Sequence, residues 1–228
     1  MLHAGIVARR VAESAQALLD SGMSGRSHLV RAGLLAAGSL AVGVVSSTDE
    51  GRAADLDSFR AANSRHDRGR DRLFLGITEL GSIWASIGAS VVLVAAGRRK
   101  TAVRALAAAC ATWTLGQVLK KAFLRPRPYD ALEDPRLLID KPRGTSWPSS
   151  HPAVLFSFVT VASRDLELGR AARVGLAALA CSVGASRAYV GVHYPSDVAG
   201  GLLLGRAVGL AWPLGERGSC SAEKDVRR

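Results

Sequence analysis

Six apolar segments follow one another along most of this chain, and polar or charged stretches separate them. They lie at about Leu29–Val45, Phe74–Gly97, Val103–Leu119, Pro152–Ser163, Val174–Ala185 and Val198–Leu214. Only the second reaches the roughly 20 residues that cross a bilayer comfortably, so run length alone leaves open the buried helices of a soluble bundle. The pattern predicts an all-α fold, and we expect a bundle of six transmembrane helices. Gly201, Gly205 and Gly209 lie four apart and predict a ridge of small residues along which helices approach closely.

Two short turns between these segments are rich in cations. Arg98, Arg99, Lys100 and Arg104 fill the first turn, and Arg164, Arg170 and Arg173 fill the second. Cations in short loops mark the cytoplasmic face of a membrane protein. If both turns are cytoplasmic, the second and third segments form one hairpin and the fourth and fifth form another. The connection over residues 48–73 holds six cations and six acidic residues, so the charge bias is not uniform along the chain.

The net charge of +11 raises the question of a nucleic-acid partner. The Lys and Arg residues are scattered at the boundaries of apolar runs, and no nucleic-acid-binding motif is present. Attraction to anionic lipid headgroups explains the excess better. The three cysteines have no paired spacing, so neither a disulfide framework nor a zinc site is expected. We expect no nucleic-acid partner, no metal and no cofactor.

Three polar clusters lie outside the apolar segments. The first is Lys120 with Arg127-Pro128, the second is Pro148-Ser149-Ser150-His151, and the third is Ser186-Arg187 with His193 and Asp197. Together they supply cations that can hold an anion, two imidazoles and one carboxylate. This set suits phosphoryl transfer without a metal, in which fixed positive groups offset the charge of the transferring group. If the cation-rich turns are cytoplasmic, all three clusters emerge at the opposite face, as a shared site requires.

Arranged as Lys-x6-Arg-Pro, Pro-Ser-x-His and Ser-Arg-x5-His-x3-Asp, the clusters resemble the signature of the type 2 phosphatidic acid phosphatase (PAP2) superfamily. That family includes lipid phosphate phosphatases, bacterial acid phosphatases and vanadium haloperoxidases. The resemblance covers roughly residues 74–213. It departs from the family pattern at Ser150, where the family usually has glycine, and Pro152 follows two residues later. It implies a PAP2-like membrane domain over residues 29–214, with the signature at 120–197. A polar lead over residues 1–28 and a disordered tail over 215–228 are expected to flank this domain.

Local chemistry supports two parts of this site. Arg127 lies between two prolines, which hold it in a rigid, non-helical segment. Its planar guanidinium is suited to bidentate contact with phosphate oxygens. Ser149 is a good helix N-cap, and the free amides of a helix start bind anions. Ser150 keeps the amide donor that the family's glycine has.

The roles of the site residues follow from the resemblance. It implies that His193 is a nucleophile forming a phosphohistidine, that His151 is the general acid, and that Asp197 orients His193. The residues expected to bind phosphate are Lys120, Arg127, Ser149, Ser150 and Arg187.

These features predict an integral, multi-pass phosphatase of the plasma membrane, with its active site on the extracytoplasmic side. Its expected partners are the membrane and a lipid phosphate or diphosphate, polyprenyl-linked or phosphatidate-like, with no obligate protein partner. One alternative is a non-catalytic protein that binds or carries lipid phosphates, which Ser150 and Pro152 would support. Another is a vanadate-dependent haloperoxidase, which uses the same set of anion-binding residues to hold vanadate.

Two further expectations concern the surroundings of the site. Trp147, Tyr189 and Tyr194 flank the clusters and suit anchoring at the membrane interface. The charged connection from Asp49 to Asp71 is expected to form a short surface helix over the site.

Overall fold

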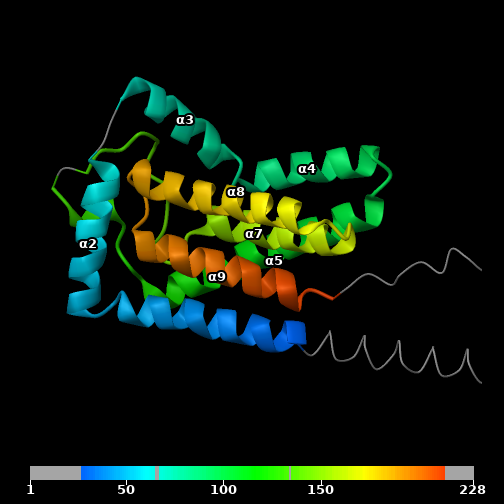
Figure 1. Ribbon diagram of the computed structural model, residues 1–228. Helices are drawn as coiled ribbons and strands as arrows, with labels where there is room; N and C mark the ends of the chain where they lie inside the picture. Colours follow the sequence, from blue (N-terminus) through cyan, green and yellow to red (C-terminus); the bar gives the residue numbers. More distant parts are fainter. Residues whose placement is uncertain (1–26, 65–66, 134, 214–228) are drawn as a thin grey trace, which may run out of the picture.

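The computed structural model describes residues 27–64, 67–133 and 135–213, and all regular structure within these ranges is helical (Figure 1). This confirms the predicted all-α class. The first helix spans Ser27–Val45. The others are α2 (Asp49–Asn63), α3 (Arg68–Glu79), α4 (Ile83–Ala95), α5 (Arg99–Phe123), α6 (Pro128–Ala131), α7 (Ser150–Asp165), α8 (Arg170–Tyr189) and α9 (Pro195–Ala211). The predicted tail, and all but the last two residues of the predicted lead, lie outside the described residues.

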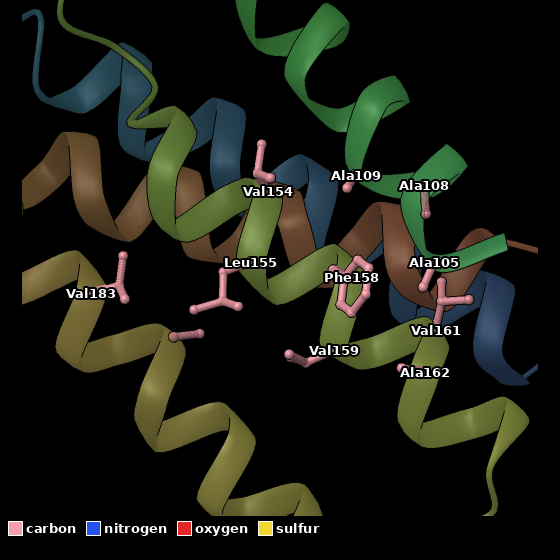
Figure 2. Packing of buried hydrophobic residues seen from close by; sticks show 11 residues of the cluster. Ala105, Ala108, Ala109, Val154, Leu155, Phe158, Val159, Val161, Ala162 and Val183 are labelled. Carbon is pink, nitrogen blue, oxygen red and sulfur yellow. The ribbon is translucent and has the colours of Figure 1, made fainter. Parts of the chain in front are cut away.

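Helix α7 is the centre of the bundle and packs against α5, α8 and α9. Its inner positions carry Val154, Leu155 and Phe158, and α5 meets them with small residues such as Ala105 and Ala109 (Figure 2). Small residues on one helix against larger ones on the next allow close, dense packing. The helix Ser27–Val45 runs along the same bundle in Figure 1, and its Ser39 hydroxyl donates to the Gly200 carbonyl of α9 at 2.8 Å.

The glycine ridge of α9 allows the predicted close approach of two helices, and the partner helix is α7. A Cβ atom on Gly201 would lie 2.3 Å from the Ser149 carbonyl oxygen, and one on Gly205 would lie 2.2 Å from that of Ala153. Such distances are far below van der Waals contact, so any side chain here would push the two helices apart. Because α7 begins at the predicted phosphate-binding serines, this close contact also sets where the site lies relative to α9.

The two cation-rich turns lie at the same end of the bundle. The Nε atom of Arg104, near the start of α5, is 2.7 Å from Oδ2 of Asp165 at the end of α7. Nη1 of Arg164 donates to the carbonyl oxygens of Gly209 and Leu210 in the last turn of α9, at 2.7 and 3.0 Å. Helices α4 and α5 therefore form one hairpin and α7 and α8 another, as predicted.

The second apolar segment is not one helix, contrary to expectation. It divides into α3 and α4, which are bent by 64° at the break. Ser82 caps α4 by accepting the Ala85 N–H at 3.1 Å. A Cβ atom on Gly81 would lie 2.8 Å from Cβ of His151, so glycine at the break allows this backbone to touch the start of α7.

The break bears on the number of membrane spans. By length and composition, the helix Ser27–Val45 and the stretch Arg99–Ala131 are apolar enough to cross a membrane, and the bent pair of α3 and α4 would be a third span. The helical hairpins and the bundle agree with the expected architecture. The total of six spans stays a prediction.

The aromatic residues expected at the membrane interface are instead buried, so that prediction is wrong. Trp147 is 0% exposed, and its ring fills the space above two glycines: Cβ atoms on Gly43 and Gly200 would come within 2.8 and 2.5 Å of it. Tyr189 stacks on Phe74 with ring centroids 4.1 Å apart. These aromatic residues hold helices together around the site.

Helix α2 lies across one end of the bundle (Figure 1). A helix is therefore present where one was predicted, but it ends at Asn63, the end of the predicted stretch belongs to α3, and no α2 residue lines the cavity described below. Thr48 caps it by accepting the Gly51 N–H at 3.1 Å. Phe59 on its inner side is buried against Tyr194. Nδ2 of Asn63 donates to the Tyr189 carbonyl at 3.0 Å, so the C-terminal half of α2 is fixed to the α8–α9 end of the bundle.

Candidate active site

The three predicted clusters meet at the end of the bundle opposite the Arg104–Asp165 pair. Lys120 comes from the last turn of α5 and Arg127 caps α6. His151 lies in the first turn of α7 and Arg187 in the last turn of α8. His193 lies in the short α8–α9 connection. Side chains from the ends of four helices and from one connection therefore lie together at this end of the bundle.

A cavity of about 290 Å³ occupies this place. The predicted residues that line it are Lys120, Arg127, Ser150, His151, Arg187 and His193. Among the remaining lining residues are Gly81, Ser82 and Trp84 from the α3–α4 break, Trp113 and Gln117 from α5, and Pro142 and Arg143 from the loop before α7. Of the eight predicted site residues, Asp197 and Ser149 do not line the cavity.

Asp197 lies behind His193. Its Oδ2 atom is 3.4 Å from Nδ1 of His193, and it also accepts the Tyr194 N–H at 2.8 Å and the Ser146 hydroxyl. The carboxylate is completely buried. It therefore favours a proton on Nδ1 of His193 and leaves the lone pair on Nε2. The 3.4 Å separation is long for a hydrogen bond, and such contacts commonly tighten when substrate binds.

His193 is kept neutral in the empty site. Burial lowers the pKa of its imidazole well below the ordinary value of 6.5, and the positive charges of Lys120, Arg127 and Arg187 lower it further. Nη1 of Arg127 is 3.2 Å from Nε2 of His193. An entering anion would compete with this nitrogen for the guanidinium and so free its lone pair for attack.

The three predicted cations also hold the protein around the cavity. Nζ of Lys120 donates to the Thr145 carbonyl at 2.9 Å. Nε of Arg127 donates to the Gly144 carbonyl at 2.8 Å. These contacts use only some of the donors, since lysine has three and arginine has five. The remaining donors are available to phosphate oxygens.

Arg187 has a buried donor that no group in the described part of the chain uses. Its Nη1 donates to the Thr78 hydroxyl at 2.7 Å, which links it to the end of α3. Its Nε is buried and has no hydrogen-bond partner among the described residues. A buried donor without a partner is costly, so its position at the cavity wall favours a bound anion.

The two predicted serines differ. Ser150 lines the cavity, and its buried hydroxyl has no partner within the described ranges. Ser149 is fully buried and does not line the cavity, and its N–H donates to the backbone carbonyl of Asp197 at 3.0 Å. The prediction that Ser149 binds phosphate is therefore wrong. Its amide instead joins the start of α7 to the start of α9, because the glycine ridge brings these two helix starts together.

Sequence reasoning missed Arg125, which lies beside the site and is buried. Its Nη1 donates to Oδ1 of Asp197 at 2.8 Å, and its Nη2 donates to Oδ2 of Asp55 in α2 at 2.5 Å. Ser196 joins the same network by donating its N–H to Oδ1 of Asp55 at 3.0 Å. The Arg-Pro pair at Arg125-Pro126 repeats the one at Arg127-Pro128, and this repeat was the signal available in the sequence.

The rim of the cavity is apolar on one side. Trp84 of α4 is 77% exposed and Trp113 of α5 is 47% exposed, although both line the cavity. The lining also contains the cations Lys120, Arg127, Arg143 and Arg187. The cavity thus offers an anion site beside an exposed apolar surface. Within the described residues, no three His, Cys, Asp or Glu side chains gather in a way that could hold a metal ion.

Comparison with known proteins agrees with this geometry. The family model of the PAP2 superfamily matches residues 101–217. An undecaprenyl-diphosphatase of Sulfolobus acidocaldarius is 30% identical over 155 residues, which cover 66% of this chain and 73% of that protein.

Two solved structures are also similar. One is a transmembrane PAP2-type phosphatidylglycerolphosphate phosphatase from Bacillus subtilis, with a TM-score of 0.69 and 25% identity, covering 78% of this chain and 92% of that one. The other is Aquifex aeolicus LpxE, with a TM-score of 0.62 and 30% identity, covering 68% of this chain and 92% of that one. The all-helical bundle described above is therefore the fold of these membrane proteins.

Proposed function

This chain belongs to the PAP2 superfamily, and we propose that it is a membrane phosphatase that hydrolyses a lipid phosphate or diphosphate through a phosphohistidine intermediate. One observation carries the proposal. A neutral, buried imidazole with a carboxylate behind it faces a cavity walled by Lys120, Arg127 and Arg187. Such a site binds a tetrahedral anion and attacks it.

In the first step, Nε2 of His193 attacks phosphorus while the bond from phosphorus to the leaving oxygen breaks. His151 lines the same cavity and gives its proton to that oxygen. The negative charge of the bound phosphate favours the protonated imidazole of His151. Asp197 stabilises the positive charge that forms on His193.

In the second step, water attacks the phosphohistidine. His151, now neutral, takes the proton of the water, the bond from phosphorus to Nε2 breaks, and inorganic phosphate leaves. The site then returns to its starting state. In both steps the charge on the transferring group is spread over its equatorial oxygens, where the fixed donors of Lys120, Arg127 and Arg187 stabilise it.

The apolar rim supports a lipid as the substrate. Trp84 and Trp113 extend from the cavity to the exposed surfaces of α4 and α5, so an acyl or polyprenyl chain in the bilayer could reach them without leaving its apolar surroundings. The named relatives act on an undecaprenyl diphosphate and a phosphatidylglycerolphosphate. Polyprenyl-linked and phosphatidate-like lipids both suit this cavity.

We place the protein in the plasma membrane with the cavity on the extracytoplasmic side. The turns that contain Arg98–Lys100 and Arg170 lie at the other end of the bundle, and their cations favour the cytoplasm. The substrate headgroup would then be presented in the outer leaflet.

Phosphate release by purified protein in detergent tests the function. The substrates would be a polyprenyl diphosphate, a polyprenyl monophosphate and phosphatidate, with His193→Ala as the matched variant. We expect release by wild type on at least one lipid and none above background by the variant. With a substrate labelled in its phosphoryl group, rapid quenching should trap an acid-labile label on His193. Equal and negligible release by both proteins on all three lipids would contradict catalysis and favour a lipid-phosphate carrier.

A further inference from the structure

The loop before α7 brings a fourth cation to the cavity. Arg143 lines it together with Lys120, Arg127 and Arg187, although it lies outside all three motif clusters. Its side chain is exposed at the cavity rim. We propose that Arg143 binds a second phosphoryl group of the substrate and so makes the enzyme a lipid diphosphatase. This inference rests on the proposed function and names the substrate class of the same site.

The backbone on both sides of Arg143 is firmly attached to the site. The Tyr129 hydroxyl donates to the Pro142 carbonyl at 2.6 Å. Nε of Arg127 donates to the Gly144 carbonyl at 2.8 Å, and Nζ of Lys120 donates to that of Thr145 at 2.9 Å. Two of these three donors belong to phosphate-binding residues. The loop that carries Arg143 is therefore positioned by the cations that hold the reacting phosphate.

A tight turn allows this arrangement. Gly144 has φ = +81°, a conformation that L side chains rarely adopt. The turn lets the carbonyls after Arg143 point at Lys120 and Arg127.

Arg143 differs from the other cavity cations in what it contacts. Lys120, Arg127 and Arg187 each donate to a protein acceptor. Arg143 makes no hydrogen bond or ion pair with any described residue. A guanidinium that lines a cavity, on a fixed loop and without a counter-charge, has its donors available for a ligand anion.

The position of Arg143 determines which anion that would be. Lys120, Arg127 and Arg187 lie around the nucleophile and suit the terminal phosphoryl group, which is transferred to His193. In a diphosphate the next phosphoryl group lies between this group and the lipid tail, on the way out of the cavity. Arg143 is at the exposed rim and suits that inner phosphoryl group. When Nε2 of His193 bonds to the terminal phosphorus, the bond to the bridging oxygen breaks and its electron pair stays on the lipid monophosphate. Arg143 would stabilise this developing charge.

The experiment compares farnesyl diphosphate with farnesyl monophosphate, which share one tail. Arg143→Gln is the test variant, and Lys141→Gln is the matched control, since Lys141 is an exposed cation of the same loop that does not line the cavity. We expect Arg143→Gln to lower kcat/KM for the diphosphate by about tenfold and to change that for the monophosphate by less than about twofold. Lys141→Gln should change neither. Arg143→Lys should recover part of the loss.

A second measurement does not depend on turnover. Methylenediphosphonate, which carries two phosphonate groups, should inhibit Arg143→Gln more weakly than wild type, while methylphosphonate should inhibit both equally. Equal losses on both farnesyl substrates, or no loss on either, would overturn the proposal for Arg143. Wild type that releases no more phosphate than His193→Ala from either substrate would instead overturn the proposed function, and this inference with it.

Discussion

Nη1 of Arg125 lies 2.8 Å from Oδ1 of Asp197, so the carboxylate behind the nucleophilic imidazole is itself held by a buried cation. The same guanidinium reaches Asp55 of α2 through Nη2 at 2.5 Å. One side chain therefore ties the orientation of His193 to the helix that lies across the end of the bundle.

Replacing Arg125 should harm both stability and turnover. Arg125→Gln leaves the charges of Asp55 and Asp197 buried without their partner, which should reduce the free energy of unfolding by about 3 kcal/mol. With Asp197 misplaced, kcat should fall by about 10- to 100-fold. Arg125→Lys should restore part of both losses. Thermal unfolding and phosphate release measure the two effects.

Asp55→Asn separates the two arms of this network. It removes the α2 carboxylate but leaves the contact of Arg125 with Asp197. We expect faster amide exchange over residues 49–63 with less than about a fivefold fall in kcat. A kcat as low as that of Arg125→Gln would mean that α2, and not the orientation of Asp197, is what Arg125 contributes.

The buried neutral imidazole of His193 predicts a pH dependence of stability. Its pKa in the folded protein lies well below 6.5, while in the unfolded chain it is near that ordinary value. Below about pH 6.5 the unfolded chain therefore binds a proton that the folded protein does not, and stability falls as the pH is lowered. We expect the Tm of wild type to fall between about pH 7.5 and 5 by more than that of His193→Asn. Parallel falls in the two proteins would exclude His193 as the source.

Gly81→Ala should disturb the start of α7. The new Cβ would lie 2.5 Å from Cγ1 of Val183 and 2.8 Å from Cβ of His151, so either the α3–α4 break or His151 must move. We expect a lower Tm and about a tenfold loss of kcat. Gly88→Ala on α4 is the control, because nothing lies within 4 Å of the position of its added Cβ. Equal behaviour of the two variants would show that contact at Gly81 does not matter for the site.

Trp84→Ala tests the apolar rim. Loss of this exposed ring should raise KM for a polyprenyl diphosphate by about fivefold, because less apolar surface meets the lipid chain. Turnover of water-soluble p-nitrophenyl phosphate should not change. Val92→Ala provides the control on the same helix, since Val92 is 67% exposed but does not line the cavity. An equal change on the lipid and the soluble substrate would contradict a role in lipid contact.

The metal-free mechanism makes a separate prediction. Treatment with a chelator should leave phosphate release unchanged, because the cations of the cavity supply the positive charge. Vanadate should inhibit, since it can adopt the geometry of the phosphoryl group in transfer. Activity that disappears with the chelator and returns with added metal would rule this mechanism out.

Much of the fold follows from local patterns in the chain. Apolar runs such as Val174–Ala185 became the centres of helices, and the glycine spacing of α9 predicted a close helix contact, although not that α7 is the partner. The motif clusters also identified eight site residues, of which six line the cavity. The second apolar segment could not be read in this way, because Gly81 at the break lies against the start of α7, and hydrophobicity along the chain does not report such a contact.

The errors in the site have a similar origin. Ser149 was expected to bind phosphate because it precedes a helix, yet its amide is taken by Asp197, which is far from it in the chain. Trp147 was expected at the interface because aromatic residues near apolar runs commonly lie there, yet two glycines from other helices make room for it inside. In both cases a partner distant in sequence decides where the group lies.

By itself the sequence determined the helical class, the end of the bundle at which the motifs emerge, and the chemical types that meet there, since apolar runs, cation-rich turns and motifs can be read directly along the chain. Only the tertiary structure decided that Arg125 supports Asp197, that Arg143 reaches the cavity, and that α3 and α4 divide at Gly81. These arrangements depend on packing between segments such as Arg125 and Asp55, which are 70 residues apart. The free energy of such contacts exists only after the helices have come together.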